Sequence, residues 1–114
     1  MSKFMYLFRS NPAAYKDLGP EQFKEQTRLW ETWLDHLGKG SHIHQMGERL
    51  SFEGKVVRGG EELVTDGPYV EVKDMIQGYL MVKAESLEQA TQLAKGCPVL
   101  AMGGSVEVRP FFEG

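Results

Sequence analysis

The sequence contains two strand-forming stretches, residues 3–9 and 76–84, whose side chains are apolar on both faces. Because side chains alternate between the two faces of a strand, residues 3–9 place aromatic side chains on one face and aliphatic ones on the other. The aromatic face consists of Phe4, Tyr6 and Phe8, and the aliphatic face consists of Met5 and Leu7. Residues 76–84 contain a continuous apolar run from Tyr79 to Val82. Strands of this kind are covered on both faces, so helices on one side of the sheet would leave a second apolar face to cover.

The sequence between and after these strands predicts two helices. Residues 20–37 begin with a proline, which suits the first helical position, and their apolar residues recur at spacings of four and three. This stripe consists of Phe23, Thr27, Trp30, Leu34 and Leu37. Trp33 lies beside the stripe, so we expect Trp30 to lie deeper in the core. The second helix begins at Ser86, which forms a capping-box pattern with Gln89.

Short strands and turns are predicted for the rest of the chain. Residues 42–65 predict short extended segments, including a hairpin with its turn at residues 53–55, and residues 105–111 predict the last strand. The resulting order of elements is typical of an α+β fold, a ferredoxin-like βαββαβ arrangement with an added hairpin. In that arrangement both helices pack on one face of an antiparallel sheet. We therefore expect a single domain over residues 1–114, with a second copy of the chain covering the open face.

The composition excludes several classes of partner. The net charge is −3, so nothing in the chain attracts a polyanion and nucleic acid is not an expected partner. A single cysteine, Cys97, allows no intrachain disulfide and permits a reducing compartment. The apolar run at the N-terminus stops at Arg9, which leaves it too short for a signal peptide or a membrane span. We expect a cytoplasmic protein without a membrane partner.

Two sequence blocks resemble a known family. Residues 64–69, Val-Thr-Asp-Gly-Pro-Tyr, are similar to the motif that gives the DGPF-type proteins of the YCII-related family their name, although Tyr69 stands where phenylalanine is usual. Glu71 and Lys73 follow at the spacing of that family. Residues 104–110 look like its C-terminal signature. The resemblance extends over nearly the whole chain.

The resemblance implies a dimeric α+β barrel, in which two ferredoxin-like sheets face each other as a homodimer. Most DGPF-type proteins have no assigned activity, and many are encoded beside extracytoplasmic-function sigma factors, which implies a regulatory setting. The wider YCII group includes a chloride-eliminating enzyme of aromatic degradation, for which a His/Asp pair has been proposed as the catalytic unit. The histidine of that pair lies early in the first helix, where residues 23–26 of this chain contain none. Only Asp66 remains as a counterpart.

Three residues are candidates for acid–base chemistry. A carboxylate at Asp66 beside a cavity would be partly desolvated, which raises its pKa and makes it a usable base. The alternative is that Asp66 accepts hydrogen bonds from amides of its own turn. Tyr69 or His36 would supply the acid, although His36 also suits a structural place near a helix C-terminus.

A second group of residues is a candidate for ligand binding: Gly67, Pro68, Glu71, Lys73, Trp33 and Arg109. Glu71 and Lys73 lie on one side of an extended segment with Tyr69, where they would bind a ligand or form a solvated edge. Trp33 would line a pocket or lie in the core. The Arg109 guanidinium would bind a carboxylate or pair with Glu107.

No metal site or organic cofactor is expected. His42 and His44 form a His-x-His pattern, and His36 would be a third ligand, but a zinc site needs three or four placed ligands. The sequence contains no phosphate loop or dinucleotide fingerprint.

Two functions remain open at this point. The first is a cytoplasmic, dimeric module that binds a small-molecule acid or a protein partner in a regulatory pathway linked to sigma factors. The second is a cofactor-independent acid–base enzyme, lyase- or isomerase-like, that performs elimination or isomerisation of a small cyclic or aromatic acid with Asp66 as the base.

Overall fold

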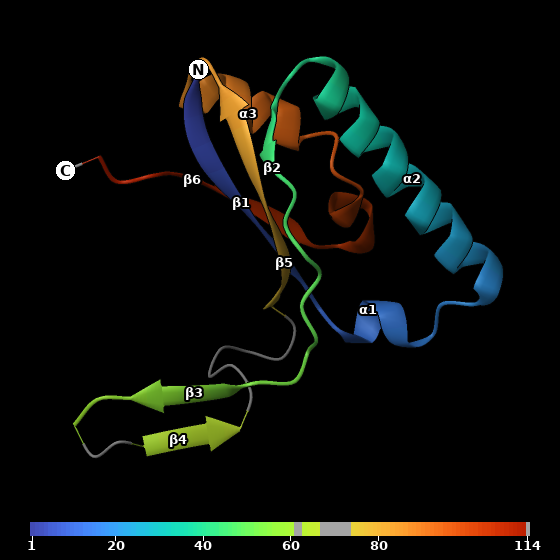
Figure 1. Ribbon diagram of the computed structural model, residues 1–114. Helices are drawn as coiled ribbons and strands as arrows, with labels where there is room; N and C mark the ends of the chain where they lie inside the picture. The colour runs from blue at the N-terminus through green and yellow to red at the C-terminus, as the bar shows by residue number, and fades with distance from the viewer. Residues whose placement is uncertain (61–62, 67–73, 114) are drawn as a thin grey trace.

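The computed structural model describes residues 1–60, 63–66 and 74–113, with the backbone alone described for residues 63–66 (Figure 1). Its elements are, in order, β1 (Ser2–Ser10), α1 (Ala13–Lys16), α2 (Pro20–Lys39), β2 (Ile43–Gln45), β3 (Lys55–Arg58), β4 (Leu63–Asp66), β5 (Met75–Ala84), α3 (Leu87–Ala94), the 3-10 helix η1 (Pro98–Met102) and β6 (Ser105–Pro110). The predicted first, central and last strands and both predicted helices are therefore confirmed. The short helix α1 has no counterpart in the sequence prediction.

Four strands form one antiparallel sheet in the order β2-β5-β1-β6. β1 lies between β5 and β6, so that Tyr6 is opposite Leu80 on one side and Val108 on the other. Adjacent first and last strands are the mark of the split βαβ arrangement. Figure 1 shows α2 and α3 on the same face of this sheet. The predicted α+β fold with an antiparallel, ferredoxin-like sheet is confirmed.

The core lies between this sheet and the two helices. Its centre is the Tyr6 ring, which stacks on Trp33 with ring centroids 6.0 Å apart and donates its hydroxyl hydrogen to the carbonyl of Ala90. Burial, followed by the nearby Cys97, raises the pKa of the Tyr6 phenol. Burial also raises the pKa of the Cys97 thiol to about 12, so this thiol stays protonated and unreactive near neutral pH.

The order of the two tryptophans in the core differs from the prediction. Trp33 is 5% exposed and Leu37 is fully buried, whereas Trp30 is only partly buried. Phe23, at the start of the predicted stripe, is 49% exposed. The sequence stripe assumed that α2 contacts the sheet along its whole length. In the structure, the buried positions of α2 lie in its C-terminal half, and the N-terminal half stands away from the sheet.

The helix starts agree with their sequence signals. The Ser86 hydroxyl accepts a hydrogen bond from the backbone N–H of Gln89 at 3.1 Å, and the Gln89 side chain accepts one from the N–H of Glu85 at 2.6 Å. At the start of α2, the Gln22 side chain accepts a hydrogen bond from the N–H of Gly19 at 2.6 Å. The bonds from Gln89 and Gly19 satisfy donors that the start of a helix leaves free, and the bond from Glu85 satisfies the donor just before the cap.

The predicted hairpin is correct in kind and wrong in position. β3 pairs with β4, with Val57 opposite Val64, and a turn begins at Gly59 and Gly60, directly after β3, instead of at 53–55. Gly60 adopts a φ of 91°, a left-handed conformation that favours glycine. Because a tight turn favours such a residue, the Gly59-Gly60 pair determines where the turn begins. Figure 1 shows this hairpin lying away from the four-stranded sheet.

The sheet face opposite the helices carries the second apolar surface that the sequence predicted. Met5 lies opposite Met81, and Leu7 lies opposite Tyr79. All four of these side chains are half-buried in the single chain. We call this surface the open face. None of the described helices has the length and apolar character that a membrane crossing requires.

Candidate functional site

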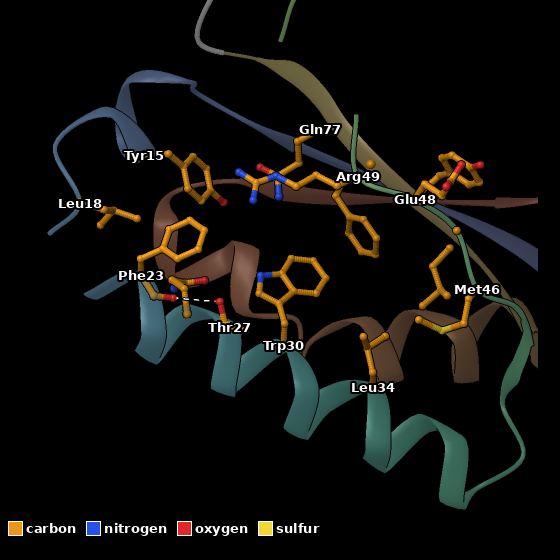
Figure 2. A pocket seen from close by; sticks show the side chains of 16 residues that line it. Tyr15, Leu18, Phe23, Thr27, Trp30, Leu34, Met46, Glu48, Arg49 and Gln77 are labelled. Carbon is orange, nitrogen blue, oxygen red and sulfur yellow. Dashed lines mark hydrogen bonds between the residues drawn. The ribbon is translucent and has the colours of Figure 1, made fainter. Parts of the chain in front are cut away.

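A cavity of about 280 Å³ lies between the N-terminal half of α2 and the sheet (Figure 2). It is lined by Phe8, Tyr15, Leu18, Phe23, Gln26, Thr27, Trp30, Leu34, Met46, Gly47, Glu48, Arg49, Gln77, Gly78, Tyr79 and Leu80. Most of these side chains are apolar, and a few polar groups lie among them, which is the usual makeup of a small-molecule site. Such sites span roughly 300–1,000 Å³, so this cavity suits a ligand at the small end of that range.

Aromatic packing fixes the floor of the cavity. The Trp30 ring packs edge-on against Phe8, with centroids 5.0 Å apart, and against Trp33, with centroids 5.7 Å apart. Because Phe8 belongs to β1 and Trp33 lies in the core, the Trp30 ring is held on two sides by rigid elements. The exposed part of its surface therefore faces the cavity in a defined position.

Residues 46–49 form the wall that closes the cavity along the edge of β5. Hydrogen bonds on both sides of Gly78 join the chain here to β5: the N–H of Tyr79 donates to the carbonyl of Glu48 at 3.4 Å, and the N–H of Leu50, the next residue after the wall, donates to the carbonyl of Gln77 at 2.7 Å. Gly47 makes the close approach possible, since a Cβ there would lie 1.8 Å from the Tyr79 carbonyl oxygen. The wall therefore depends on a glycine at this position.

Two buried polar atoms in the cavity lining have no hydrogen-bond partner among the described residues. They are the hydroxyl oxygen of Tyr15 and the side-chain carbonyl oxygen of Gln26. A buried polar group left without a partner costs roughly 1–3 kcal/mol. Both atoms are therefore suited to a ligand that supplies the missing bonds.

Arg49 brings a positive charge to the same cavity. Its guanidinium carbon lies 5.9 Å from the centroid of the Tyr15 ring, within the range of a cation–π contact. Figure 2 shows the side chains of Arg49, Tyr15 and Gln77 at the same end of the cavity. Among the described residues, no carboxylate pairs with Arg49.

The Gln77 amide is oriented by a buried neighbour. Ser10 is 2% exposed and Gln77 is 8% exposed, and the Ser10 hydroxyl donates a hydrogen bond to the side-chain oxygen of Gln77. Because the oxygen of the Gln77 amide is used in this way, its NH₂ group is the end left for another partner.

The residues that the family motif suggested lie mostly outside the described part of the chain. Gly67, Pro68, Tyr69, Glu71 and Lys73 belong to the undescribed segment 67–73. For Asp66 the structure describes only the backbone, at the end of β4 and opposite Lys55. The roles predicted for these residues remain hypotheses.

The other predicted site residues do not line the cavity. His36 is exposed on α2. Trp33 lies in the core, and its indole N–H donates to the carbonyl of Leu93 at 3.0 Å. Arg109 is exposed on β6 and pairs with Glu107 at 3.0 Å, as the structural alternative for it predicted.

The charged cluster around Glu107 lies across the sheet from the cavity. The hydrogen bond from Arg109 lowers the pKa of the Glu107 carboxylate most, and the hydrogen bond from Arg9 lowers it less. Burial acts in the opposite direction and raises that pKa. The Glu107 side chain is about one third exposed, so solvent weakens these ion pairs.

The histidines do not form a metal site in the described part of the chain. Nδ1 of His42 lies 2.8 Å from the carbonyl oxygen of Lys83, and His44 is exposed. Within residues 1–60 and 74–113, no group of three or more histidine, cysteine or acidic side chains is arranged to hold a metal ion.

Sequence reasoning missed the polar residues that line the cavity. Tyr15, Gln26 and Arg49 belong to a short helix, a long helix and an irregular segment, and no motif spacing links them. No sequence signal marked them, because Phe23 fits the apolar stripe and only the structure shows that it is 49% exposed where the helix departs from the sheet.

The fold and the site define a class of protein. It is an α+β domain with a four-stranded antiparallel sheet, two helices on one face and a small cavity beneath the longer helix. The model of the YCII-related domain family matches residues 4–113. The chain therefore belongs to the YCII-related family. No curated protein gives a significant match to it.

Solved structures that match this fold include an enzyme complex that shares it over nearly its full length. It is 5-chloro-2-hydroxyhydroquinone dehydrochlorinase (TftG) from Burkholderia phenoliruptrix AC1100, in complex with 2,5-dihydroxybenzoquinone. The two proteins are 18% identical, the alignment covers 98% of this chain and 95% of that chain, and the TM-score is 0.54. At this identity, the similarity shows a common fold.

Proposed function

We propose that this YCII-related domain binds a small ring compound in the cavity between α2 and the sheet, as a ligand-binding module in a regulatory pathway. The observation that carries the proposal is the pair of buried polar atoms, on Tyr15 and Gln26, that lack partners within an otherwise apolar cavity. Burying such atoms without a bond is unfavourable, and a bound ligand would remove that cost.

The shape of the cavity supports a ring as the ligand. Its floor is the Trp30 ring, and Phe8 and Phe23 add aromatic surface on neighbouring walls. Aromatic side chains pack well against flat rings, in edge-on or offset-stacked geometry. The similar dehydrochlorinase, whose complex contains a dihydroxybenzoquinone, is in line with a ring-sized ligand in this fold.

Filling the cavity tests this proposal. Thr27 lines the cavity from α2, and its hydroxyl bonds to the carbonyl of Phe23 at 3.0 Å. In Thr27→Trp, the indole would occupy the ligand volume. We expect benzoate and benzamide at about 100 times their dissociation constants to stabilise the wild-type domain by about 2.7 kcal/mol, and Thr27→Trp to lose this gain. Thermal shift measurements give both values.

Thr32→Trp is the matched control for this experiment. Thr32 also lies on α2 and bonds to the backbone one turn earlier, to Arg28 at 2.9 Å, but it does not line the cavity. We expect Thr32→Trp to respond to the ligands as the wild-type domain does. Equal ligand responses in Thr27→Trp and Thr32→Trp would rule out the cavity as the binding site.

The catalytic alternative remains a hypothesis beside the binding role. A cofactor-independent elimination or isomerisation would use Asp66 as the base, and the enzymatic activity named for the similar structure supports it. Turnover of small cyclic and aromatic acids by the wild-type domain and by Asp66→Asn separates the two roles. The catalytic alternative expects turnover that Asp66→Asn loses while it still binds the ligand, whereas a binding module turns over none of these acids in either form.

We also propose that two copies of the chain form a homodimer through the open face of Met5, Leu7, Tyr79 and Met81. These side chains form adjacent pairs across β1 and β5, and a sheet with one apolar face left in water is unfavourable. Glu107 and Arg109 lie beside them on β6, opposite Leu7 and Met5, and would form a polar border for such an interface.

A charge placed in the open face should separate the two copies. We expect the wild-type domain to sediment as a dimer at micromolar concentration and Met81→Glu to sediment as a monomer, because symmetry would bury two like charges together. Leu87→Glu, at a 48% exposed apolar position on α3, is the control and should stay dimeric. A monomeric wild-type domain would contradict the proposal.

A further inference from the structure

We propose that the cavity selects ring compounds that carry a carboxylate, and that the carboxylate binds at the end formed by Arg49, Tyr15 and Gln77. This inference rests on the proposed ligand-binding function and adds the chemical class and orientation of the ligand. It assigns the anion-binding role to residues that neither the family motif nor the sequence patterns indicated.

The first argument is the state of the Arg49 guanidinium. Arg9, Arg28 and Arg109 each pair with a carboxylate of the chain, at 3.2, 2.6 and 3.0 Å respectively. Arg49 contacts the Tyr15 ring and, within the described residues, no carboxylate. Its planar fork of N–H donors matches the two oxygens of a carboxylate. At the cavity it is therefore available for an anionic ligand.

The second argument is the set of donors around that guanidinium. The Tyr15 hydroxyl is buried, lines the cavity and lacks an acceptor. The Gln77 amide has its oxygen occupied by Ser10, which leaves its NH₂ group as a donor. The cation–π contact keeps Tyr15 close to Arg49. The backbone bonds that join residues 48–50 to β5 keep Gln77 close to the same segment. Three donors at one end of an apolar cavity suit an acceptor with negative charge.

The third argument is the acceptor on α2. The side-chain oxygen of Gln26 is buried in the lining and receives no hydrogen bond. A carboxylate has no hydrogen to give it, so a bond here must come from a different group of the ligand. A hydroxyl substituent on the ring would supply that donor. Together, Arg49, Tyr15, Gln77 and Gln26 therefore describe a hydroxylated ring acid.

The experiment compares acids with neutral amides of the same shape. Isothermal titration calorimetry is carried out with benzoate and benzamide, and with cyclohexanecarboxylate and cyclohexanecarboxamide, on the wild-type domain, Arg49→Met and Tyr15→Phe. We expect each acid to bind the wild-type domain more tightly than its amide. Loss of a charge-assisted hydrogen bond should weaken acid binding roughly tenfold or more in Arg49→Met, with the amides unaffected. Tyr15→Phe keeps the ring beneath Arg49 and should weaken the acids by roughly fivefold.

Arg28→Met is the matched control for the loss of positive charge. Arg28 lies on the exposed side of α2, where it pairs with Glu25, and it does not line the cavity. We expect the Arg28→Met variant to bind benzoate with the same affinity as the wild-type domain. Equal affinities for acid and amide, or an unchanged affinity for benzoate in Arg49→Met, would overturn the inference. The absence of binding by all four compounds would instead overturn the proposed function.

A second pair of compounds tests the acceptor on Gln26. We expect 3-hydroxybenzoate or 4-hydroxybenzoate to bind at least roughly threefold more tightly than benzoate, and Gln26→Leu to remove that difference. If neither isomer gains over benzoate, or if the gain survives in Gln26→Leu, the role assigned to Gln26 is overturned.

Discussion

Replacing Trp33 with alanine is expected to lower the free energy of unfolding by about 3–5 kcal/mol. Trp33 is 5% exposed and packs against the rings of Tyr6 and Phe8, each with its centroid 6.0 Å away. The substitution removes a buried side chain that packs α2 against β1, and it leaves the carbonyl of Leu93 without the indole donor. Small domains are stable by about 5–15 kcal/mol, so this loss is a large part of the total. Denaturant unfolding measures it.

Trp30→Ala is the informative comparison, because it removes the same side chain from the neighbouring position. Trp30 is only partly buried and faces the cavity, so its removal leaves a smaller core defect and a larger ligand site. We expect the cost in stability to be clearly less than for Trp33→Ala, and the loss in ligand affinity to be greater. If the two stabilities changed by the same amount, the separation of core and cavity along α2 would be incorrect.

Gly47→Ala is expected to destabilise the domain by about 2–3 kcal/mol and to abolish ligand binding, as an overpacked site does. The added Cβ would lie 1.8 Å from the Tyr79 carbonyl oxygen and 2.7 Å from the Tyr79 ring. Because the nearest atom belongs to the backbone of β5, residues 46–49 would have to move away from the sheet. That movement breaks the hydrogen bond to Glu48 and displaces Arg49. Unfolding and titration with benzoate measure the two effects.

Gly54→Ala is the control for a glycine without close neighbours. A Cβ at Gly54 would meet no atom of the described residues within 4 Å, so the substitution should change stability by no more than about 0.5 kcal/mol and leave ligand binding unchanged. A Gly47→Ala variant as stable as Gly54→Ala would show that the wall of residues 46–49 does not pack on β5 as described.

The sequence patterns predicted the main elements because those patterns are local. The alternation of residues 3–9 follows from the period of a strand, and the serine at position 86 marks a helix start through a bond to a residue three positions on. Both signals depend on neighbours within one turn or one strand. Because they do not depend on distant contacts, the structure confirmed the elements that they predict.

The predicted turn of the hairpin failed where two local signals competed. Glu53-Gly54-Lys55 and Gly59-Gly60 both contain turn-forming glycines, and pairing of β3 with β4 required the second. Which glycine lies in a turn depends on which strands find partners, and that information is not local. The prediction that Trp30 lies deeper in the core than Trp33 was wrong for a similar reason. Which of the two is buried depends on where α2 meets the sheet.

The candidate site shows most clearly which features follow from local sequence and which follow from tertiary contacts. The sequence by itself determined an α+β chain with two helices, an antiparallel sheet and strands apolar on both faces, because the periods of helix and strand are written in neighbouring residues. Only the tertiary structure decided that Tyr15, Gln26 and Arg49 share one cavity. These residues come from three separate segments, which the packing of α2 over the sheet and the hydrogen bonds between residues 48–50 and β5 bring together. This arrangement depends on contacts between distant parts of the chain, which no local pattern encodes.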